Sequence, residues 1–230
     1  PEDTSGVNTQ VHELIAHHLG ALPHVSAAMW DLHASLFDQA QAAFAPAQQS
    51  LILREHFRCA PEIIRFSNEQ FYDEKIEPLR LPLPHERLEP ALVAVRVPDG
   101  QWHETTEGAR NQREAEALAD KIVELCADER YAGRTMGVIS LHGIAQAELI
   151  ADLLRERLTA EEIVRRRLVC GDARHFQGDE REVMLLSLVA SAEPQPQPLT
   201  HRFEAQRFNV ATSRARHQLW DVATRRARPR

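Results

Sequence analysis

The chain has 230 residues, 43% of them hydrophobic and 27% charged, and its formal net charge is −7. This composition excludes a disordered, collagen-like or coiled-coil protein, and no apolar run reaches the roughly 18 residues that a membrane helix needs. The net negative charge also argues against a protein that holds nucleic acid by bulk charge alone, although local basic groups can still do so. All but two of the 27 basic residues are arginines, which suit bidentate phosphate contacts. A GC-rich genome explains the same bias equally well.

The cysteines and the N-terminus indicate a cytoplasmic protein with no membrane partner. Cys59, Cys126 and Cys170 are far apart and odd in number, so we expect neither a disulfide framework nor a cysteine metal site. The start, Pro1–Asp3, has neither the basic residues nor the apolar core of a signal peptide. It also lacks a Met, from which we expect the chain to be a piece of a longer protein.

Hydrophobic spacing and turn residues predict the elements of the first half. Pro61 suits the first turn of a helix, and four prolines between Pro78 and Pro90 suit an extended surface connection. We expect residues 1–50 to form a helical lead-in to the main domain. In chain order the predicted elements are helices over 10–20 and 34–47, a buried strand over 51–53, a helix from 61 to about 72, the connection over 78–90 and a strand over 92–97.

The second half alternates between helix and strand patterns. Such alternation predicts βαβ units, in which a mostly parallel sheet is covered by helices on both faces. We therefore predict an α/β domain over residues 51–224, followed by a solvated basic tail over 225–230. The predicted elements are a helix over 110–127, a strand over 136–141, a helix over 144–158, strands from 167 and over 182–190, a helix over 203–216 and a strand over 218–222.

The usual signatures of a self-contained active site are missing. Lys75 and Lys121 follow acidic residues, so there is no Gly-Lys-Ser/Thr phosphate loop, and the glycines form no GxGxxG. His12 and His17 resemble a zinc-protease motif but are five residues apart, so they lie about 140° apart on a helix. We find no GxSxG nucleophile motif either, and we expect no metal site in this chain.

Three polar segments lie next to predicted strand ends, where α/β proteins bind ligands. Arg58 precedes the N-terminus of a predicted helix, a position that favours anions. Residues 170–183 form a dense polar link between two strands. In the third segment, 207–216, helical spacing predicts that Arg207 and Arg214 share a face and that Arg216 points elsewhere. Each segment by itself also fits an ordinary solvated loop or helix.

Taken together and in order, these segments resemble motifs IV, V and VI of superfamily 1 helicases, in the branch typified by the nonsense-mediated-decay helicase. The resemblance covers about residues 51–222. The sequences of these segments are most similar to those of a bacterial group of large ATP-dependent helicases. Ser140, Leu141 and His142 differ from the Thr-Pro-Tyr of that branch. The matching stretches are His56–Ile63, Phe176–Glu180 with Ser187, and Asn209–Arg216, together with Gly137–Leu141 and Gln146, which look like motif IVa.

The resemblance implies the second RecA-like motor domain of an ATP-dependent helicase, with a three-layer fold. Mg²⁺-bound ATP would lie between this domain and a first RecA-like domain of the same parent chain, which would carry the phosphate loop and the Mg²⁺ ligands. Arg58 and Arg214 would act as arginine fingers on the γ-phosphate. The other implied nucleotide-site residues are Gln177, Gly178, Glu180 and Arg207. The implied contacts to single-stranded nucleic acid are Ser140, His142, Gln146 and Phe176.

Two other interpretations stay open at this point. A degenerate α/β domain that only binds a partner protein or regulates an attached enzyme would not need Arg58, Glu180 and Arg214. A flavodoxin-like nucleotide binder would need a phosphate loop of its own. The sequence does not distinguish DNA from RNA.

Overall fold

A computed structural model describes residues 51–189 and 202–224, with a few isolated positions before them (13–14, 17–19, 36–37 and 40). For residues 202–204 it describes the backbone only. The chain divides into two compact units, Pro1–Leu53 and Arg54–Arg230, and the second unit carries the fold. The predicted lead-in helices lie largely, and the basic tail wholly, outside the described residues.

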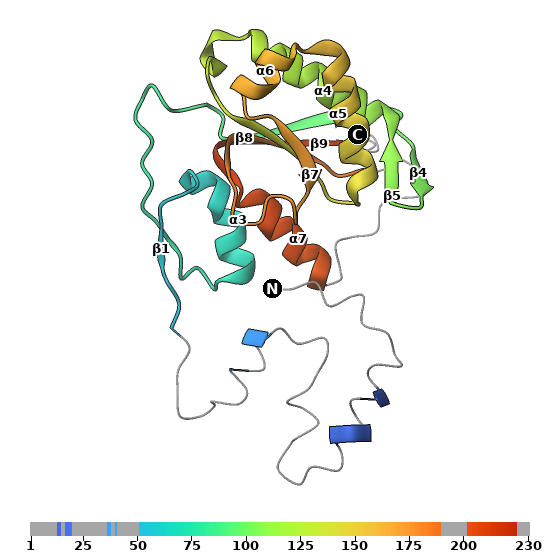
Figure 1. Cartoon of the computed structure of the whole chain (residues 1–230). Helices are drawn as coiled ribbons and strands as arrows, with labels where there is room; N and C mark the ends of the chain where they lie inside the picture. Colours follow the sequence, from blue (N-terminus) through green and yellow to red (C-terminus); the bar gives the residue numbers. More distant parts are fainter. Residues whose placement is uncertain are drawn as a thin grey trace, which may run out of the picture. The chain divides into compact units, whose positions relative to one another are not determined.

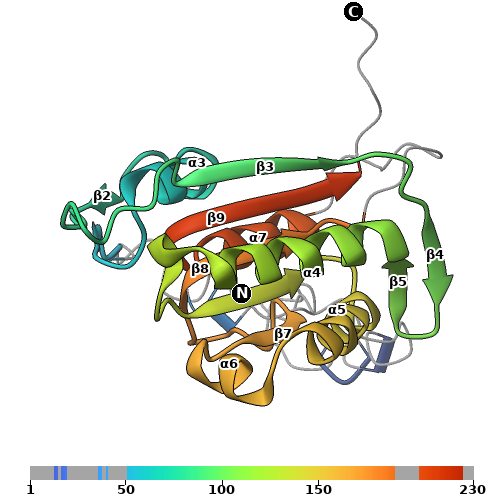
Figure 2. The ribbon, with the colours of Figure 1, turned by 90° about the horizontal axis from the view of Figure 1, so that it is seen from above.

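A five-stranded sheet forms the centre of the second unit (Figure 2). All of its neighbouring strands are parallel, and their order is β3-β9-β8-β6-β7. Ser140, Ser187 and Val222 lie side by side on β6, β8 and β9, so these strands end at a common edge. The strands are β3 (Leu92–Val97), β6 (Met136–Ser140), β7 (Val169–Asp172), β8 (Arg181–Ser187) and β9 (Ala215–Thr224).

Helices cover both faces of the sheet (Figure 1). The apolar residues of α4 (Gln112–Ala127) and α5 (Ile144–Arg157) form one core with one face. Those of α3 (Pro61–Phe71) and α7 (Arg202–Thr212) form a second core with the other face. The predicted α/β, RecA-like architecture of three layers is thus confirmed. None of the described helices is long and apolar enough to cross a membrane.

The helix predictions rest on local chemistry that the structure confirms. Asn111 caps α4 by accepting a hydrogen bond from the backbone N–H of Glu114. Pro61 opens α3, where a missing N–H costs nothing. An apolar stripe of α4 is buried against the sheet and comprises Ala115, Leu118, Ala119, Ile122 and Leu125.

Several small elements differ from the prediction. Residues 51–53 form no strand and are exposed, and the first extended pairing is that of β1 (Glu55–His56) with β2 (Glu77–Pro78). The β4–β5 hairpin, the short η2 helix and α6 are not among the predicted elements. Their bounds are β4 Trp102–Thr105, β5 Gly108–Asn111, η2 Glu129–Tyr131 and α6 Ala160–Arg165.

The last helix ends earlier than predicted, and this changes the position of two arginines. α7 stops at Thr212 because the chain turns to enter β9 at the buried Ala215, where the Arg214 carbonyl accepts the N–H of Arg181 from β8 (3.0 Å). Arg214 therefore lies in the turn and Arg216 lies in β9. The prediction that Arg207 and Arg214 share a helix face is wrong.

Candidate functional site

Arg58, Glu180 and Arg214 come from distant parts of the sequence and meet at the amino ends of β8 and β9. Arg58 precedes α3, whereas Glu180 and Arg214 each immediately precede a strand. The Nε of Arg58 donates to Oε2 of Glu180 at 2.8 Å, and its Nη1 donates to the carbonyl of Ser213 at 3.4 Å. Through these two contacts Arg58 links the segments that resemble motifs IV, V and VI.

This cluster lies at the edge opposite to the one that the general rule indicates. Open α/β sheets usually bind ligands at the carboxyl ends of their strands. Arg58 instead meets the links that lead into β8 and β9, because the polar link before β8 returns across the sheet to its amino end. The residues that resemble motif IVa lie at the carboxyl end.

Arg214 braces the backbone around the cluster. Its Nε donates to the carbonyl of Val210 at 3.0 Å, in the last turn of α7, where a cation is favourable. Its Nη1 lies 3.4 Å from the carbonyl of Phe176 and 3.5 Å from that of Asp179, both in the link before β8. Burial, and then the neighbouring charge of Arg58, lower the pKa of Arg214. Its guanidinium therefore lies in a partly desolvated, positively charged setting.

Arg216 lies on the other side of Glu180. Its Nε is 3.4 Å from Oε1 of Glu180, and its side chain is 39% exposed. Its backbone carbonyl accepts the N–H of Ala60 at 2.8 Å, which fixes the start of α3 to β9. Glu180 is therefore shared between Arg58 and Arg216.

The cluster carries more positive than negative charge. Four guanidinium groups gather here, and within the described part of the chain two of them, Arg58 and Arg216, form ion pairs with one carboxylate, that of Glu180. Burial, and then the charge of Arg216, lower the pKa of Arg80, as expected for cations that repel one another. Such an imbalance favours an anion, and arginine is the side chain best suited to phosphate. The four groups belong to Arg58, Arg80, Arg214 and Arg216.

The remaining residues predicted for the nucleotide site lie around this cluster. Gln177 and Gly178 are exposed in the link before β8, and Arg207 is partly buried on α7. Gly178 has a φ of +81°, a conformation that glycine adopts without strain, and a Cβ added at this position would meet no other residue within 4 Å. The surface at this turn is thus open to a ligand.

The residues predicted to contact nucleic acid are mostly buried. Phe176 is 0% exposed and packs under the Arg181 guanidinium, 5.6 Å from the ring centroid, so its side chain belongs to the core. Ser140 and Gln146 are also buried, and Gln146 bonds to the backbone of Asn111. Only His142 among the four is exposed. The three buried residues thus offer no side-chain surface to a bound strand.

A buried polar network lies at the carboxyl ends of β8 and β9. The carboxylate of Glu114 accepts the hydroxyl of Ser187 (2.6 Å), the N–H of Val189 (2.7 Å) and the N–H of Thr224 (3.3 Å). Gln146 donates to the same Ser187 hydroxyl at 3.1 Å. The sequence analysis missed Glu114, although its position four residues before Leu118, which places both on the buried face of α4, was a signal that it points inward.

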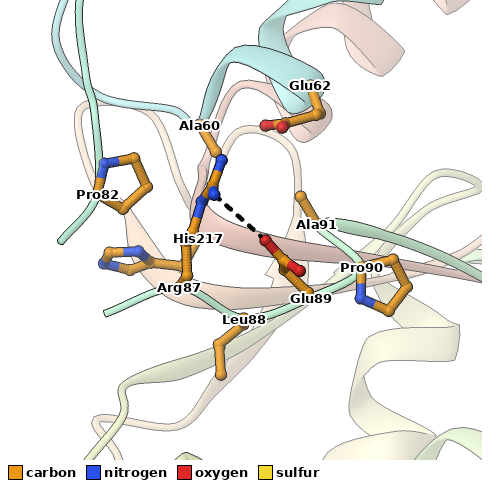
Figure 3. Close-up of a pocket in the computed structure, with 9 residues that line it drawn as sticks. All are labelled: Ala60, Glu62, Pro82, Arg87, Leu88, Glu89, Pro90, Ala91 and His217. Carbon is orange, nitrogen blue, oxygen red and sulfur yellow. Dashed lines mark ion pairs between the residues drawn. The ribbon is translucent and has the colours of Figure 1, made fainter. Parts of the chain in front are cut away.

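A pocket of about 500 Å³ lies beside the arginine cluster, between the start of α3, β9 and the connection before β3 (Figure 3). Its walls are largely apolar, and its charged groups include Arg87 and Glu89, which pair with each other at 3.4 Å. The pocket is lined by Ala60, Glu62, Pro82, Arg87, Leu88, Glu89, Pro90, Ala91 and His217.

We expect the domain to lose folding stability at mildly acidic pH because of the buried His217. Burial, and then the charges of Arg80 and Arg134, lower the pKa of His217 to about 4, whereas an unfolded chain protonates histidine near 6.5. The contribution of the neutral His217 to the free energy of unfolding is therefore complete above pH 6.5. It falls as the pH drops towards 4, because in this range only the unfolded chain takes up the proton. Urea unfolding between pH 7 and 4 tests this. His217→Gln should lose less stability over that window, and an equal loss would contradict the assignment.

In the described part of the chain, no three His, Cys, Asp or Glu residues are grouped so that they could hold a metal ion. A comparison with curated proteins gave no match. The model of a family described as AAA domain matches residues 32–226, which include all the described strands and helices of the second unit. This domain is found in superfamily 1 helicase-like proteins, which supports a helicase-like motor domain. The chain therefore belongs to the AAA domain family.

Proposed function

We propose that this chain is the second motor domain of an ATP-dependent helicase and supplies arginine fingers to an ATP site shared with a first motor domain. The observation that carries this proposal is the arginine cluster around Glu180, with its excess of positive charge. The family supports a helicase-like ATPase, and the three motif-like segments meet at this cluster. A domain that only binds a protein partner has no need of such a cluster.

The γ-phosphate of ATP would replace Glu180 as the partner of Arg58. In the structure Glu180 holds the Arg58 guanidinium in place by a partly buried, charge-assisted hydrogen bond. A phosphate that carries more charge competes with one carboxylate, and charge that develops during transfer strengthens the contact further. Arg214 would approach the same phosphate from the turn before β9.

The first motor domain would supply what this sequence lacks. Without a phosphate loop, the chain has no lysine to hold the β- and γ-phosphates. The resemblance places the Asp-Glu pair that holds Mg²⁺ in the first motor domain. Mg²⁺ would supply charge neutralisation at the phosphates. The residues of this chain would then orient the γ-phosphate and respond to its loss.

Single-stranded nucleic acid would bind along the carboxyl edge, near His142. This side chain is exposed, whereas Ser140 and Gln146 near the same end of β6 are buried. A strand held mainly through its phosphates requires no sequence-reading element. Movement of the two motor domains upon ATP binding and hydrolysis would then shift the strand.

The isolated 230-residue chain should not hydrolyse ATP at a meaningful rate. It carries only one side of the proposed site, so neither Mg²⁺ nor the leaving phosphates would be held. Steady-state phosphate release tests this, with a parent protein that contains both motor domains as the positive control. Robust turnover by the isolated chain that is abolished by Arg58→Ala would contradict a shared site.

A further inference from the structure

Arg80 lies outside all three motif-like segments but bonds to the backbone of the proposed finger. It belongs to the connection between β2 and β3 and is partly buried. Its Nη1 donates to the carbonyl of Arg58 at 3.0 Å, and its Nη2 lies 2.9 Å from Nε2 of His217 on β9. We propose that Arg80, braced by His217, is a positioning residue that fixes the backbone of Arg58 for its contact with the γ-phosphate. This inference rests on the proposed function.

The contact between Arg80 and His217 determines the state of the imidazole ring. A guanidinium group has only donors, so Nε2 of His217 must accept and the proton of the neutral ring must sit on Nδ1. A doubly protonated ring would face Arg80 with a second donor at 2.9 Å. His217 is 3% exposed and lies on a central strand, so it gives Arg80 a rigid support.

Arg58 needs such support because its own segment has few backbone contacts. The two-residue β1 precedes it and pairs only with the equally short β2. The Nε2 of His56 accepts the N–H of Cys59 at 3.0 Å, and Glu180 holds the guanidinium. Arg80 adds a bond to the carbonyl of Arg58, so the residue is held at its backbone and at its side chain.

The extended connection directs Arg80 towards the cluster. Successive side chains of an extended segment point to opposite sides. Leu79 and Leu81 are exposed to 44% and 82%, whereas Arg80 between them is partly buried and meets Arg58 and His217. The direction of Arg80 therefore follows from the backbone of the connection and not from a free surface rotamer.

The first arm of the test uses the 230-residue chain and needs no nucleotide. Long-range ¹H–¹⁵N spectra should show His217 with its proton on Nδ1, and the Nε–Hε signal of Arg58 should be protected from exchange with solvent. Arg80→Ala should abolish that protection, and so should His217→Leu. His217→Gln keeps an acceptor and should retain most of it. Arg87→Ala, which removes an exposed arginine from the same connection, is the matched control and should change nothing.

The second arm measures ATP hydrolysis by the parent protein. A displacement of about 1 Å in a positioning group can cost roughly 10²-fold in rate, so Arg80→Ala should lower kcat by about that factor. The KM for ATP should change little, since Arg80 does not itself touch the nucleotide. Arg80→Lys keeps the positive charge but has one donor nitrogen in place of the two that contact Arg58 and His217. It should therefore restore only part of kcat.

The Arg58 and Arg80 variants distinguish a failure of the positioning role of Arg80 from a failure of the proposed function. If Arg58→Ala leaves hydrolysis intact, the proposed function fails, whatever Arg80 does. If Arg58→Ala abolishes hydrolysis but a folded Arg80→Ala variant keeps a normal kcat, the positioning role is overturned. A normally protected Arg58 signal in Arg80→Ala would overturn it as well.

Discussion

Replacing Arg58 or Arg214 by alanine should lower the ATPase rate of the parent protein by roughly 10³–10⁵-fold, the usual cost of losing an arginine finger. Arg58 contacts Glu180 through one partly buried hydrogen bond, for which a phosphate would compete. Arg214 lies in the turn before β9, close enough for the charge of Arg58 to lower its pKa. Two guanidinium groups held together in this way gain a favourable partner when negative charge develops on the γ-phosphate.

The two variants should differ in stability. Arg214 bonds to the carbonyls of Val210, Phe176 and Asp179, so Arg214→Ala removes the side chain that holds α7 to the link before β8. Arg58 makes one weak backbone contact, at 3.4 Å to Ser213, and its loss should cost less. Thermal melts recorded beside nucleic-acid-stimulated phosphate release will separate the loss of a finger from the loss of a brace.

Arg216→Ala is the control variant with which Arg58→Ala and Arg214→Ala should be compared. Arg216 shares Glu180 with Arg58 but points from β9, and its ion pair is longer, at 3.4 Å. We expect a much smaller effect on turnover. If Arg216→Ala abolishes hydrolysis in a folded protein while Arg214→Ala does not, the finger is Arg216 and our assignment of Arg214 is wrong.

The layer architecture could be predicted because its signals are local. The apolar stripe of α4 repeats with the period of a helix, and the buried run of β8 is a continuous apolar segment. Pro61 and Asn111 mark helix starts by their own chemistry. The alternation of such elements leaves few topologies other than a parallel sheet between two helical layers.

Other features could not be predicted because they depend on tertiary contacts. The end of α7 is set by the pairing of Arg214 with Arg181 on β8, and nothing within residues 203–216 marks it. Phe176 lies in a polar stretch of sequence, yet the link folds back over the sheet and buries it. Which edge holds the arginine cluster also follows only from the path of that link.

Replacing Glu114 by alanine should destabilise the domain by about 2–4 kcal/mol. Glu114 is 0% exposed, and its carboxylate accepts hydrogen bonds from Ser187, Val189 and Thr224. Alanine would leave these three buried donors without an acceptor, and each unsatisfied buried group costs about 1–3 kcal/mol before relaxation. Urea unfolding of the 230-residue chain measures the loss. Glu116→Ala, two residues along the same helix, is the matched control.

Glu116→Ala is a suitable control because Glu114 and Glu116 have the same helix propensity but different environments. The Glu116 carboxylate accepts one exposed hydrogen bond, from Gln112, so its loss should stay within about 0.5 kcal/mol. The Glu114 network joins the ends of β8 and β9 to the start of α4, and through Gln146 to α5. Equal losses from the two substitutions would show that this network does not hold the carboxyl edge together. A selective loss in Glu114→Ala would show that this network holds the ends of β8 and β9 to α4.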